Sequence, residues 1–338
     1  MSSLARAWWI AEVVSMTEML DNRYDVVVIG GGAAGLNGAL MLARARRSVL
    51  VLDSGTPRNA PADGVHGLLG VEGTPPRVLL ERGQSEVRQY GGRVVNTVVD
   101  AVRRGADGVF EVPLADGRVV GARRLLVTSG VIDELPDIPG LRERWGRDVV
   151  HCPYCHGWEV RDLAIGVLAN GPLAVHQALL FRQWSQNIVF FARGAVLTDE
   201  QAEQFAARGI DVVSDEVAAV EVIDDRLAGV RLADGTVVER AVLAVGSRTV
   251  ARADFLTGLG LRAEEHPSGV GDYIRTDEAG RTDVPGVWAA GNLTNPVAQV
   301  GAAAVAGAVA AAQINLDLLH EDTQIAVTGY RARLAVQR

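Results

Sequence analysis

The sequence predicts an α/β protein made of two three-layer domains with parallel sheets, the second inserted in the first. A chain of 338 residues is long enough for two domains. Residues 25–29 form a continuous apolar run typical of a strand buried on both faces. A glycine-rich turn follows, then a helical pattern over 36–44 and a strand over 48–53, which complete a βαβ unit. A second strand–helix–strand pattern begins at residue 164, and the character of the first unit returns after residue 250.

The remaining elements follow from hydrophobic periodicity and turn residues. In chain order they are a Pro- and Gly-rich loop (55–76), an amphipathic helix (78–90), short strands around a turn at 116–117, a strand (125–130), a strand (164–169), a helix (173–184), a strand (187–191), a hairpin-like stretch around 234–235, a strand (241–246), a strand (287–292) and an Ala-rich helix (301–319). We therefore expect an N-terminal extension over 1–23, an outer domain made of 24–130 and 251–325, and an inserted domain over 131–250.

Composition excludes several classes of function. All 33 basic residues are Arg, so Schiff-base chemistry and a P-loop with its phosphate-binding Lys are both excluded. The net charge of −8 argues against nucleic acid as a partner. We expect no membrane partner, because the apolar stretch at residues 7–14 is short and interrupted by Glu12. It also lacks the features of a signal peptide, so we expect a cytoplasmic protein.

The turn after the first strand predicts a dinucleotide site. Gly30, Gly32 and Gly35 form a G-x-G-x-x-G pattern between a strand and a helix, with Ala33 and Ala34 in its variable positions. Such a turn lets the backbone approach a pyrophosphate, which then lies at the helix N-terminus. Asp53, at the end of the next strand, is placed to accept hydrogen bonds from ribose hydroxyls. This context makes the turn a Rossmann fingerprint.

Both cysteines of the chain lie in one string, His151-Cys152-Pro153-Tyr154-Cys155-His156. Three interpretations compete. Cys-x-x-Cys-His also matches the haem attachment motif, which requires an exported protein. A zinc site would need two further ligands, and His151 and His156 lie too near the cysteines in sequence for the usual paired spacing. A reversible disulfide suits the spacing, because it places both sulfurs within one helical turn. We favour the redox pair.

These motifs occur in the order and spacing of the low-molecular-weight thioredoxin reductase family, which the chain resembles over about residues 24–320. The fingerprint, the string from Cys152 to Glu159 and the pair Gly291-Asn292 carry the resemblance. It implies two Rossmann-like domains, FAD as cofactor and a homodimer. It also implies that Cys155 lies against the flavin, Cys152 exchanges with substrate, and His156 moves protons in place of the family's acidic residue. Further FAD contacts are expected from Asn59, Thr128, Gly130, Gly291, Asn292, Gln299 and Val300.

The inserted domain departs from the family. Where a second fingerprint should stand it has Ala169-Asn170-Gly171-Pro172-Leu173-Ala174, and only Arg193 stands where an Arg cluster would hold the 2′-phosphate. We therefore expect NADPH binding to be weak or absent. Within the family, the string after Cys152, the loop over 57–61 and His66-Gly67 resemble the gliotoxin- and holomycin-type dithiol oxidases.

The resulting hypothesis is a dithiol oxidase. A substrate thiolate attacks the Cys152–Cys155 disulfide at Cys152, and the second substrate thiol closes a disulfide in the small-molecule substrate. The electrons pass from Cys155 to FAD and then to oxygen, which gives hydrogen peroxide. The alternatives are a reductase that uses NADPH or another donor to reduce a disulfide, and a redox sensor whose cysteine pair switches a partner surface. No metal site is expected, and the sequence does not identify the dithiol.

Overall fold

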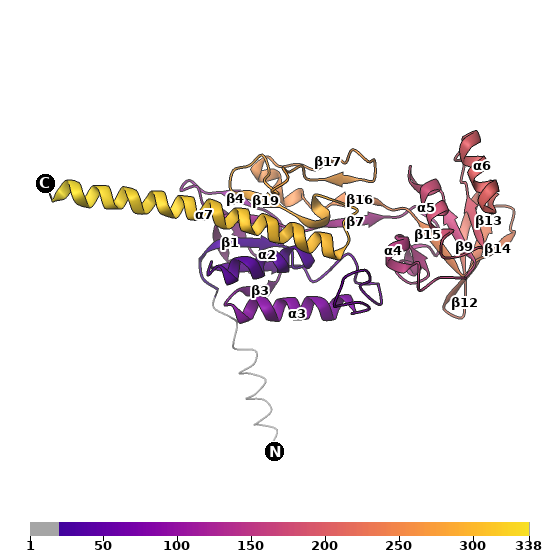
Figure 1. Cartoon of the computed structure of the whole chain (residues 1–338), viewed down its shortest axis with the longest axis horizontal. Helices are drawn as coiled ribbons and strands as arrows, with labels where there is room; N and C mark the ends of the chain where they lie inside the picture. Colours follow the sequence, from indigo (N-terminus) through magenta and orange to yellow (C-terminus); the bar gives the residue numbers. More distant parts are fainter. Residues whose placement is uncertain (1–19, 338) are drawn as a thin grey trace, which may run out of the picture.

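The computed structural model describes residues 20–337, whose elements form an elongated molecule with an outer domain, an inserted domain and two connecting strands (Figure 1). The predicted fold class is confirmed: both domains are three-layer units built on a sheet with parallel strands, and the chain leaves the outer domain, forms the inserted one and returns. Most of the expected N-terminal extension, residues 1–19, lies outside the described residues.

The outer domain is built on a seven-stranded sheet in the order β3-β2-β1-β6-β5-β4, with β19 also paired to β6. Its strands are β1 (Arg23–Ile29), β2 (Val49–Asp53), β3 (Arg93–Asn96), β4 (Arg103–Arg104), β5 (Phe110–Pro113), β6 (Val119–Val127) and β19 (Val287–Ala289). Because β1, β2, β3, β6 and β19 are parallel, their carboxyl ends meet at one edge of the sheet.

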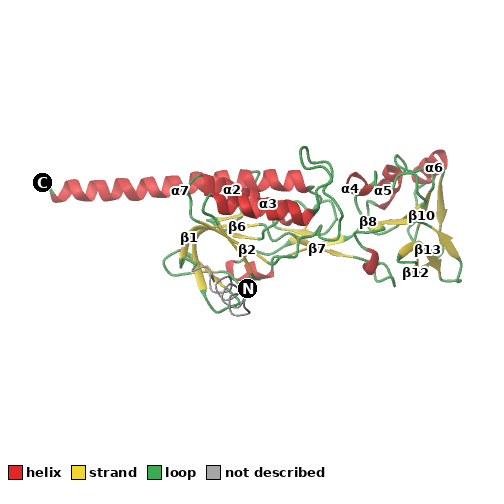
Figure 2. Ribbon diagram, turned by 90° about the horizontal axis from the view of Figure 1, so that it is seen from below, coloured by secondary structure: helices red, strands yellow, loops and turns green. Residues whose placement is uncertain are grey.

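Three helices cover one face of this sheet (Figure 2): α2 (Ala33–Arg44), α3 (Pro76–Gln89) and α7 (Val300–Val336). Val26 and Val28 of β1 pack toward these helices, whereas Val27 and Ile29 pack on the other side. Burial on both faces explains why the strand has no polar position at its centre. The remaining elements of the domain are the 3₁₀ turns η2 (Asp254–Leu259) and η3 (Gly291–Leu293) and the paired strands β17 (Glu264–Glu265) and β18 (Asp272–Tyr273).

The inserted domain has a parallel sheet in the order β11-β10-β9-β15-β8. Phe181, Phe190 and Phe205 fill the core on its helical side, and an antiparallel three-stranded sheet packs on the other side. Its elements are η1 (Arg142–Arg144), β8 (Val149–Val150), α4 (Pro153–His156), β9 (Ile165–Leu168), α5 (Ala174–Phe181), β10 (Ile188–Phe191), α6 (Asp199–Arg208), β11 (Ile210–Val213), β12 (Val217–Ile223), β13 (Arg226–Leu232), β14 (Val237–Glu239) and β15 (Val242–Val245).

Two antiparallel strands, β7 (Val131–Glu134) and β16 (Arg248–Ala251), join the domains. Asp133 of β7 is held by Arg58, whose Nε and one terminal nitrogen donate to the two carboxylate oxygens at 2.8 and 2.7 Å. The other terminal nitrogen of Arg58 donates to the carbonyl of Pro296 at 2.7 Å. A loop of the outer domain therefore holds the connection to the inserted one, and α4 lies on the side that faces the outer domain (Figure 1).

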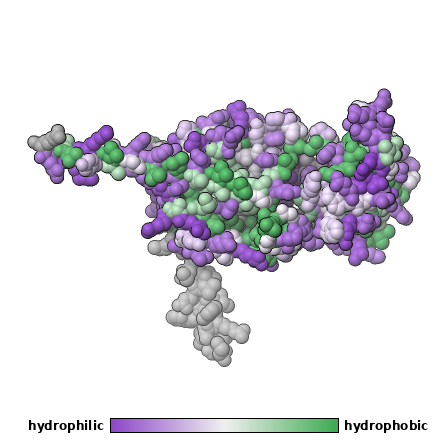
Figure 3. Space-filling view, in the orientation of Figure 1, coloured by the Kyte–Doolittle hydropathy of each residue, from purple (hydrophilic) through white to green (hydrophobic). Residues whose placement is uncertain are grey.

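Some predicted boundaries were wrong. The strand expected over 287–292 ends at Ala289, because Gly291 adopts a φ of 76° that a strand cannot contain. The helix expected over 301–319 continues to Val336, because residues 320–336 contain no Pro and the single Gly329 does not end the helix. The far part of α7 projects from the body (Figure 1 and Figure 3). Its exposed side chains include Ile325 and Tyr330.

By length and hydropathy, α7 is the one helix of residues 20–337 that could cross a membrane, although a buried core helix meets the same criteria. Its first half packs along α2 at close range. A Cβ added to Gly307 would lie 1.9 Å from the carbonyl oxygen of Ala34, so only Gly fits there. Ala310, Ile314 and Leu318 are fully buried in the same contact. Packing on the sheet and α2 thus accounts for the buried side of the first half of α7, whereas Val305, Val309 and Leu319 on its other side are exposed.

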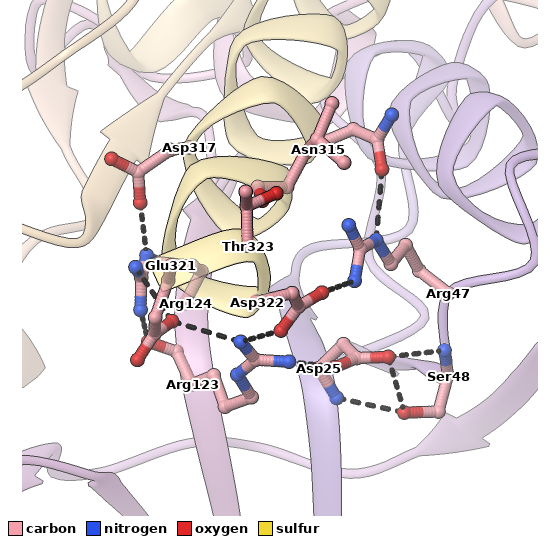
Figure 4. Close-up of polar contacts among 11 residues, drawn as sticks. Asp25, Arg47, Ser48, Arg123, Arg124, Asn315, Asp317, Glu321, Asp322 and Thr323 are labelled. Carbon is pink, nitrogen blue, oxygen red and sulfur yellow. Dashed lines mark hydrogen bonds and ion pairs between the residues drawn. The ribbon is translucent and has the colours of Figure 1, made fainter. Parts of the chain in front are cut away.

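An ion network attaches the middle of α7 to the sheet (Figure 4). Arg123 of β6 donates to Asp25 at 2.8 Å and to Asp322 at 2.5 Å, and Arg47 donates to Asp322 at 2.7 Å. Burial alone would lower the pKa of Arg123, but the hydrogen bonds to these carboxylates and to Glu321 raise it above its ordinary value. The network continues through Arg124, Asp317 and Glu321.

Arg123→Met is expected to lower the free energy of unfolding by about 1–3 kcal/mol, because it leaves partly buried carboxylates without their partner. Urea denaturation measures this loss, and added salt should narrow the difference from the unmodified protein. Arg118→Met, which breaks the exposed pair with Asp116, is the matched control and should have no measurable effect. Unchanged stability of Arg123→Met would show that the network does not hold α7 on the sheet.

Candidate active site

A cavity of about 650 Å³ lies between the two domains and brings most of the predicted site residues together. The outer domain contributes the glycine-rich turn and Asp53 to its wall, and the inserted domain contributes Cys152, Cys155 and His156. The other predicted residues that line it are Gly30, Gly32, Ala33, Ala34, Asn59, Thr128, Gly130, Gly291, Asn292, Gln299 and Val300. Gly35 does not line it. A Cβ on Gly35 would lie 1.9 Å from the carbonyl oxygen of Gly30, so Gly35 serves the tight packing of the turn.

The glycine-rich turn is shaped by steric limits. Gly30 has a φ of 108°, and a Cβ there would lie 2.4 Å from the carbonyl oxygen of Thr128. The N–H of Gly31 donates to Asp53 at 3.0 Å, which holds this carboxylate against the turn. At Gly32, by contrast, a Cβ would meet nothing within 4 Å. Gly32 is the N-cap of α2 and no side chain caps this helix, so the first N–H groups of α2 face the cavity side of the turn.

The second end of the cofactor region is the segment before α7. The amide nitrogen of Asn292 donates hydrogen bonds to the carbonyls of Asn295, Pro296 and Ala298 at 3.1, 3.3 and 2.9 Å. These bonds use the nitrogen to shape the loop, and the amide oxygen remains as an acceptor for a ligand hydroxyl. Gln299 is the N-cap of α7 and makes no side-chain capping bond. A second helix N-terminus therefore reaches the same cavity.

These features fit FAD. A pyrophosphate needs close backbone approach and an uncapped helix N-terminus, which Gly32 and α2 provide. A ribose needs a carboxylate at the end of β2, which Asp53 provides. An electron-rich ring is favoured by the N-terminus of α7, at Gln299 and Val300.

The cysteine pair is built on a single helical turn. Cys152 is the N-cap of α4, and the N–H groups of Cys155 and His156 both donate to its carbonyl at 3.1 Å. Both cysteines are free thiols and partly buried. The Cys155 thiol donates a hydrogen bond to the Cys152 sulfur. The N–H groups of Cys155 and Tyr154 and the side chain of Gln299 also bind this sulfur, and together these bonds lower the pKa of Cys152 to about 6. The same pairing raises the pKa of Cys155, so Cys152 holds the negative charge of the reduced pair.

Two histidines flank the pair. His156 is largely buried, and its Nδ1 has no hydrogen-bond partner within the described protein. Burial lowers the pKa of His156, so its ring is neutral and free to accept a proton. His151 points Nδ1 at the carbonyl of Val245 at 3.1 Å, and burial lowers its pKa as well. Among residues 20–337 no group of three or more His, Cys, Asp or Glu is arranged to hold a metal ion.

In the inserted domain, Asn170 of the turn that corresponds to the fingerprint and Arg193 after the next strand both bind backbone carbonyls of the same domain. Asn170 donates to the carbonyl of Gly246 at 2.5 Å. Arg193, the single Arg of the expected phosphate-binding string, donates to the carbonyl of Ala169 at 3.2 Å. Both side chains therefore make contacts within the domain at the position where a second dinucleotide would need free donors.

Sequence reasoning missed three contributions to the site. It placed Gln299 with the cofactor but did not expect its contact with Cys152. It did not find the ion pair of Arg58 with Asp133 at all, since 75 residues separate the partners and no motif marks them. It singled out His66 only as part of a resemblance, yet His66 lines the cavity.

Gly32→Ala is expected to fold with unchanged thermal stability, because the added methyl group meets open space, but to purify with less flavin. The methyl group would occupy the position where a pyrophosphate approaches the backbone. The ratio of flavin to protein absorbance measures this loss. Gly329→Ala on the exposed part of α7 is the control and should retain full flavin content. Full occupancy in Gly32→Ala would contradict the assigned cofactor position.

Alkylation of the reduced protein by iodoacetamide should select Cys152, with a pH midpoint near 6, since the thiolate fraction rises as pH passes the pKa of Cys152. Gln299→Leu removes one hydrogen bond to this sulfur and should move the midpoint to higher pH. Mass spectrometry of the labelled peptide gives both results. Preferential labelling of Cys155, or an unchanged midpoint in Gln299→Leu, would refute the assignment.

Comparison with known proteins agrees with this site. Residues 24–312 match the model of the family described as pyridine nucleotide-disulphide oxidoreductase. The chain is 32% identical to thioredoxin reductase sirT of Leptosphaeria maculans, over 88% of this chain and 95% of that protein. It is 34% identical to thioredoxin reductase tcpT of Claviceps purpurea, over 88% of this chain and 96% of that protein.

Solved structures of similar fold include close relatives of this chain. The crystal structure of HlmI superposes with a TM-score of 0.87 at 46% identity, over 93% of this chain and 98% of that one. An oxidoreductase from Agrobacterium tumefaciens gives a TM-score of 0.81 at 37% identity, over 88% of this chain and 99% of that one. Together with the cavity and its cysteine pair, these matches show that the chain belongs to the pyridine nucleotide-disulphide oxidoreductase family and is an FAD-dependent disulfide oxidoreductase of the thioredoxin reductase-like type.

Proposed function

We propose that the protein oxidises a small-molecule dithiol to its disulfide, with oxygen as the final electron acceptor and hydrogen peroxide as product. The observation that carries this direction is the state of the inserted domain. Asn170 donates to the carbonyl of Gly246, and Arg193, which stands alone where an Arg cluster would hold a 2′-phosphate, uses one of its N–H groups for the carbonyl of Ala169. A reductase would need those donors for its electron source, whereas a dithiol oxidase receives its electrons through the cysteine pair.

The geometry supports a substrate that reacts at Cys152. A substrate thiolate attacks the Cys152 sulfur of the oxidised pair, the bond to Cys155 breaks, and Cys155 leaves with the electron pair. The second substrate thiol then attacks the sulfur bonded to Cys152, and Cys152 leaves as a thiolate. Its lowered pKa makes it a good leaving group in this step.

Protons and electrons are handled on the Cys155 side of the pair. The unpartnered Nδ1 of His156 is available to accept a proton released in the exchange. FAD, when bound, supplies a two-electron acceptor that oxygen can reoxidise. The chain's own contribution is to hold Cys155 at the cavity wall, on the rigid turn of α4.

A small substrate is favoured over a protein because both cysteines are partly buried in the cavity wall. Tyr154 and Trp158 stand exposed beside them, with 63% and 65% of their surface accessible, and offer apolar faces to a ring-bearing dithiol. The expectations of a homodimer and of a cytoplasmic location stay predictions.

A second candidate is a disulfide reductase, which the names of the two fungal relatives favour, since both are called thioredoxin reductase. The two functions differ in which compound donates electrons to the enzyme. A reductase takes them from NADPH and delivers them through Cys152, whereas the proposed oxidase takes them from the dithiol.

Anaerobic mixing with dithiothreitol is expected to bleach the flavin absorbance, whereas NADPH alone should leave it unchanged. Readmission of air should restore the absorbance and yield one hydrogen peroxide per dithiol oxidised. Cys152→Ser and Cys155→Ser should each abolish bleaching by the dithiol while retaining flavin. Rapid bleaching by NADPH in the unmodified protein would overturn the oxidase in favour of the reductase.

A further inference from the structure

One polar cluster at the cavity has no role in the chemistry described so far. It is formed by His66 and Glu72 in the loop between β2 and α3, and it reaches Glu159, which follows α4 in the inserted domain. His66 lines the main cavity together with Cys152 and Gln299. It also lines an adjoining hollow of about 240 Å³, whose wall includes Tyr154 and Trp158.

The loop holds His66 in a fixed position. Val65 is buried and forms an isolated bridge with Thr74, which closes the loop on both sides of the histidine. Glu72 accepts from the N–H of Gly67 at 2.9 Å and contacts Nδ1 of His66 at 2.6 Å. The hydrogen bonds from His66 and Gly67 lower the pKa of Glu72, so its carboxylate is ionised and acts only as an acceptor.

This arrangement assigns the tautomer of the imidazole. Because an ionised Glu72 can only accept, Nδ1 of His66 carries the hydrogen and donates it. In the neutral ring, Nε2 is then a lone-pair acceptor, as in a carboxylate–histidine dyad that serves a nucleophile. The Nε2 atom faces the inserted domain, where the nearest carboxylate oxygen of Glu159 is 3.6 Å away.

His66 and Cys152 line the same cavity, and Gln299 connects the loop after His66 to the cysteine. A Cβ added to Gly67 would lie 3.9 Å from Oε1 of Gln299, and the side chain of Gln299 is hydrogen-bonded to the Cys152 sulfur. The residue after His66 is thus separated from the reactive sulfur by a single side chain. His156 belongs to α4 itself, so the two histidines come from different domains.

We propose that His66, oriented by Glu72, is the base that removes the proton from the substrate thiol that attacks Cys152. The inference rests on the proposed function, in which a dithiol gives up two protons and two electrons. The S–H bond of the entering thiol breaks, its proton passes to Nε2 of His66, and the sulfur bonds to Cys152 as Cys155 leaves with the electron pair of the disulfide. His156 then remains available for the second proton.

A base is required because an ordinary thiol has a pKa of about 8.5 and is only slightly ionised at neutral pH. The ionisable groups that face His66 are Glu72 in its own loop and Glu159 and His156 from the inserted domain. Cys152 lines the same cavity, and Asp63 interacts electrostatically with His156.

The test is the anaerobic rate of flavin bleaching by dithiothreitol in the flavin-loaded protein, measured by stopped flow from pH 6 to pH 10. His66→Gln should slow bleaching at pH 7 by about a hundredfold, the lower end of general-base effects. The loss should shrink toward the unmodified rate above about pH 9, where the substrate thiol ionises without help. Glu72→Gln should show a smaller loss with the same pH dependence.

Two further variants separate a base from a structural contact. Glu159→Gln removes the contact between domains but keeps the dyad, so it should bleach within about twofold of the unmodified rate. His266→Gln, whose imidazole lies against Ser268 and Tyr273, is the matched histidine control and should be unchanged. All variants are first compared for flavin content.

Distinct outcomes overturn the inference and the proposed function. The base role of His66 is wrong if His66→Gln bleaches at the unmodified rate at pH 7. It is also wrong if the bleaching rate of His66→Gln falls equally at every pH and Glu159→Gln shows the same fall. If the unmodified protein bleaches with NADPH but not with dithiothreitol, the proposed function fails, and the base assignment fails with it. Glu72→Gln decides the question if His66→Gln does not fold.

Discussion

The site depends on the ion pair that joins Arg58 to Asp133. Asp133 lies in one of the two strands that connect the domains, and its side chain is only 8% exposed. Burial raises the pKa of Asp133, but the hydrogen bonds and charge of Arg58, with a hydrogen bond from Ser247, lower it overall. The carboxylate is therefore ionised and holds its partner firmly. Because Arg58 also binds the segment before α7, one guanidinium ties the strand that leads into the inserted domain to the cofactor region.

The second constraint is the parallel sheet of the outer domain. Its strands run in one direction, so Gly30 after β1, Asp53 in β2, Thr128 after β6 and Gly291 after β19 all lie at the same edge. Residues far apart in sequence thereby share one cavity wall. The backbone at this edge is tightly packed at Gly30 and open at Gly32, a difference that fits a pyrophosphate lying against Gly32.

Sequence reasoning located those parts of the site that are encoded locally. The glycine-rich turn, the strand that ends at Asp53 and the helical turn of the cysteine pair each follow from spacing within a short segment. Contacts across the domain boundary, such as Arg58 with Asp133 and His66 with Glu159, depend on how the two domains are placed, which no local pattern encodes. The end of α7 was missed for a different reason, because only a weak breaker, Gly329, lies in its second half.

The unequal cysteines have a consequence for electron transfer. With the pKa of Cys152 near 6 and that of Cys155 raised, the reduced pair carries one proton at neutral pH, not two. Its oxidation therefore releases two electrons with a single proton, and its reduction potential falls by about 30 mV per pH unit. An ordinary dithiol releases two protons and its potential falls by about 59 mV. Between the pKa of Cys152 and the pKa of an ordinary thiol, about 8.5, each rise in pH thus makes electron transfer from a dithiol to this pair more favourable by the difference.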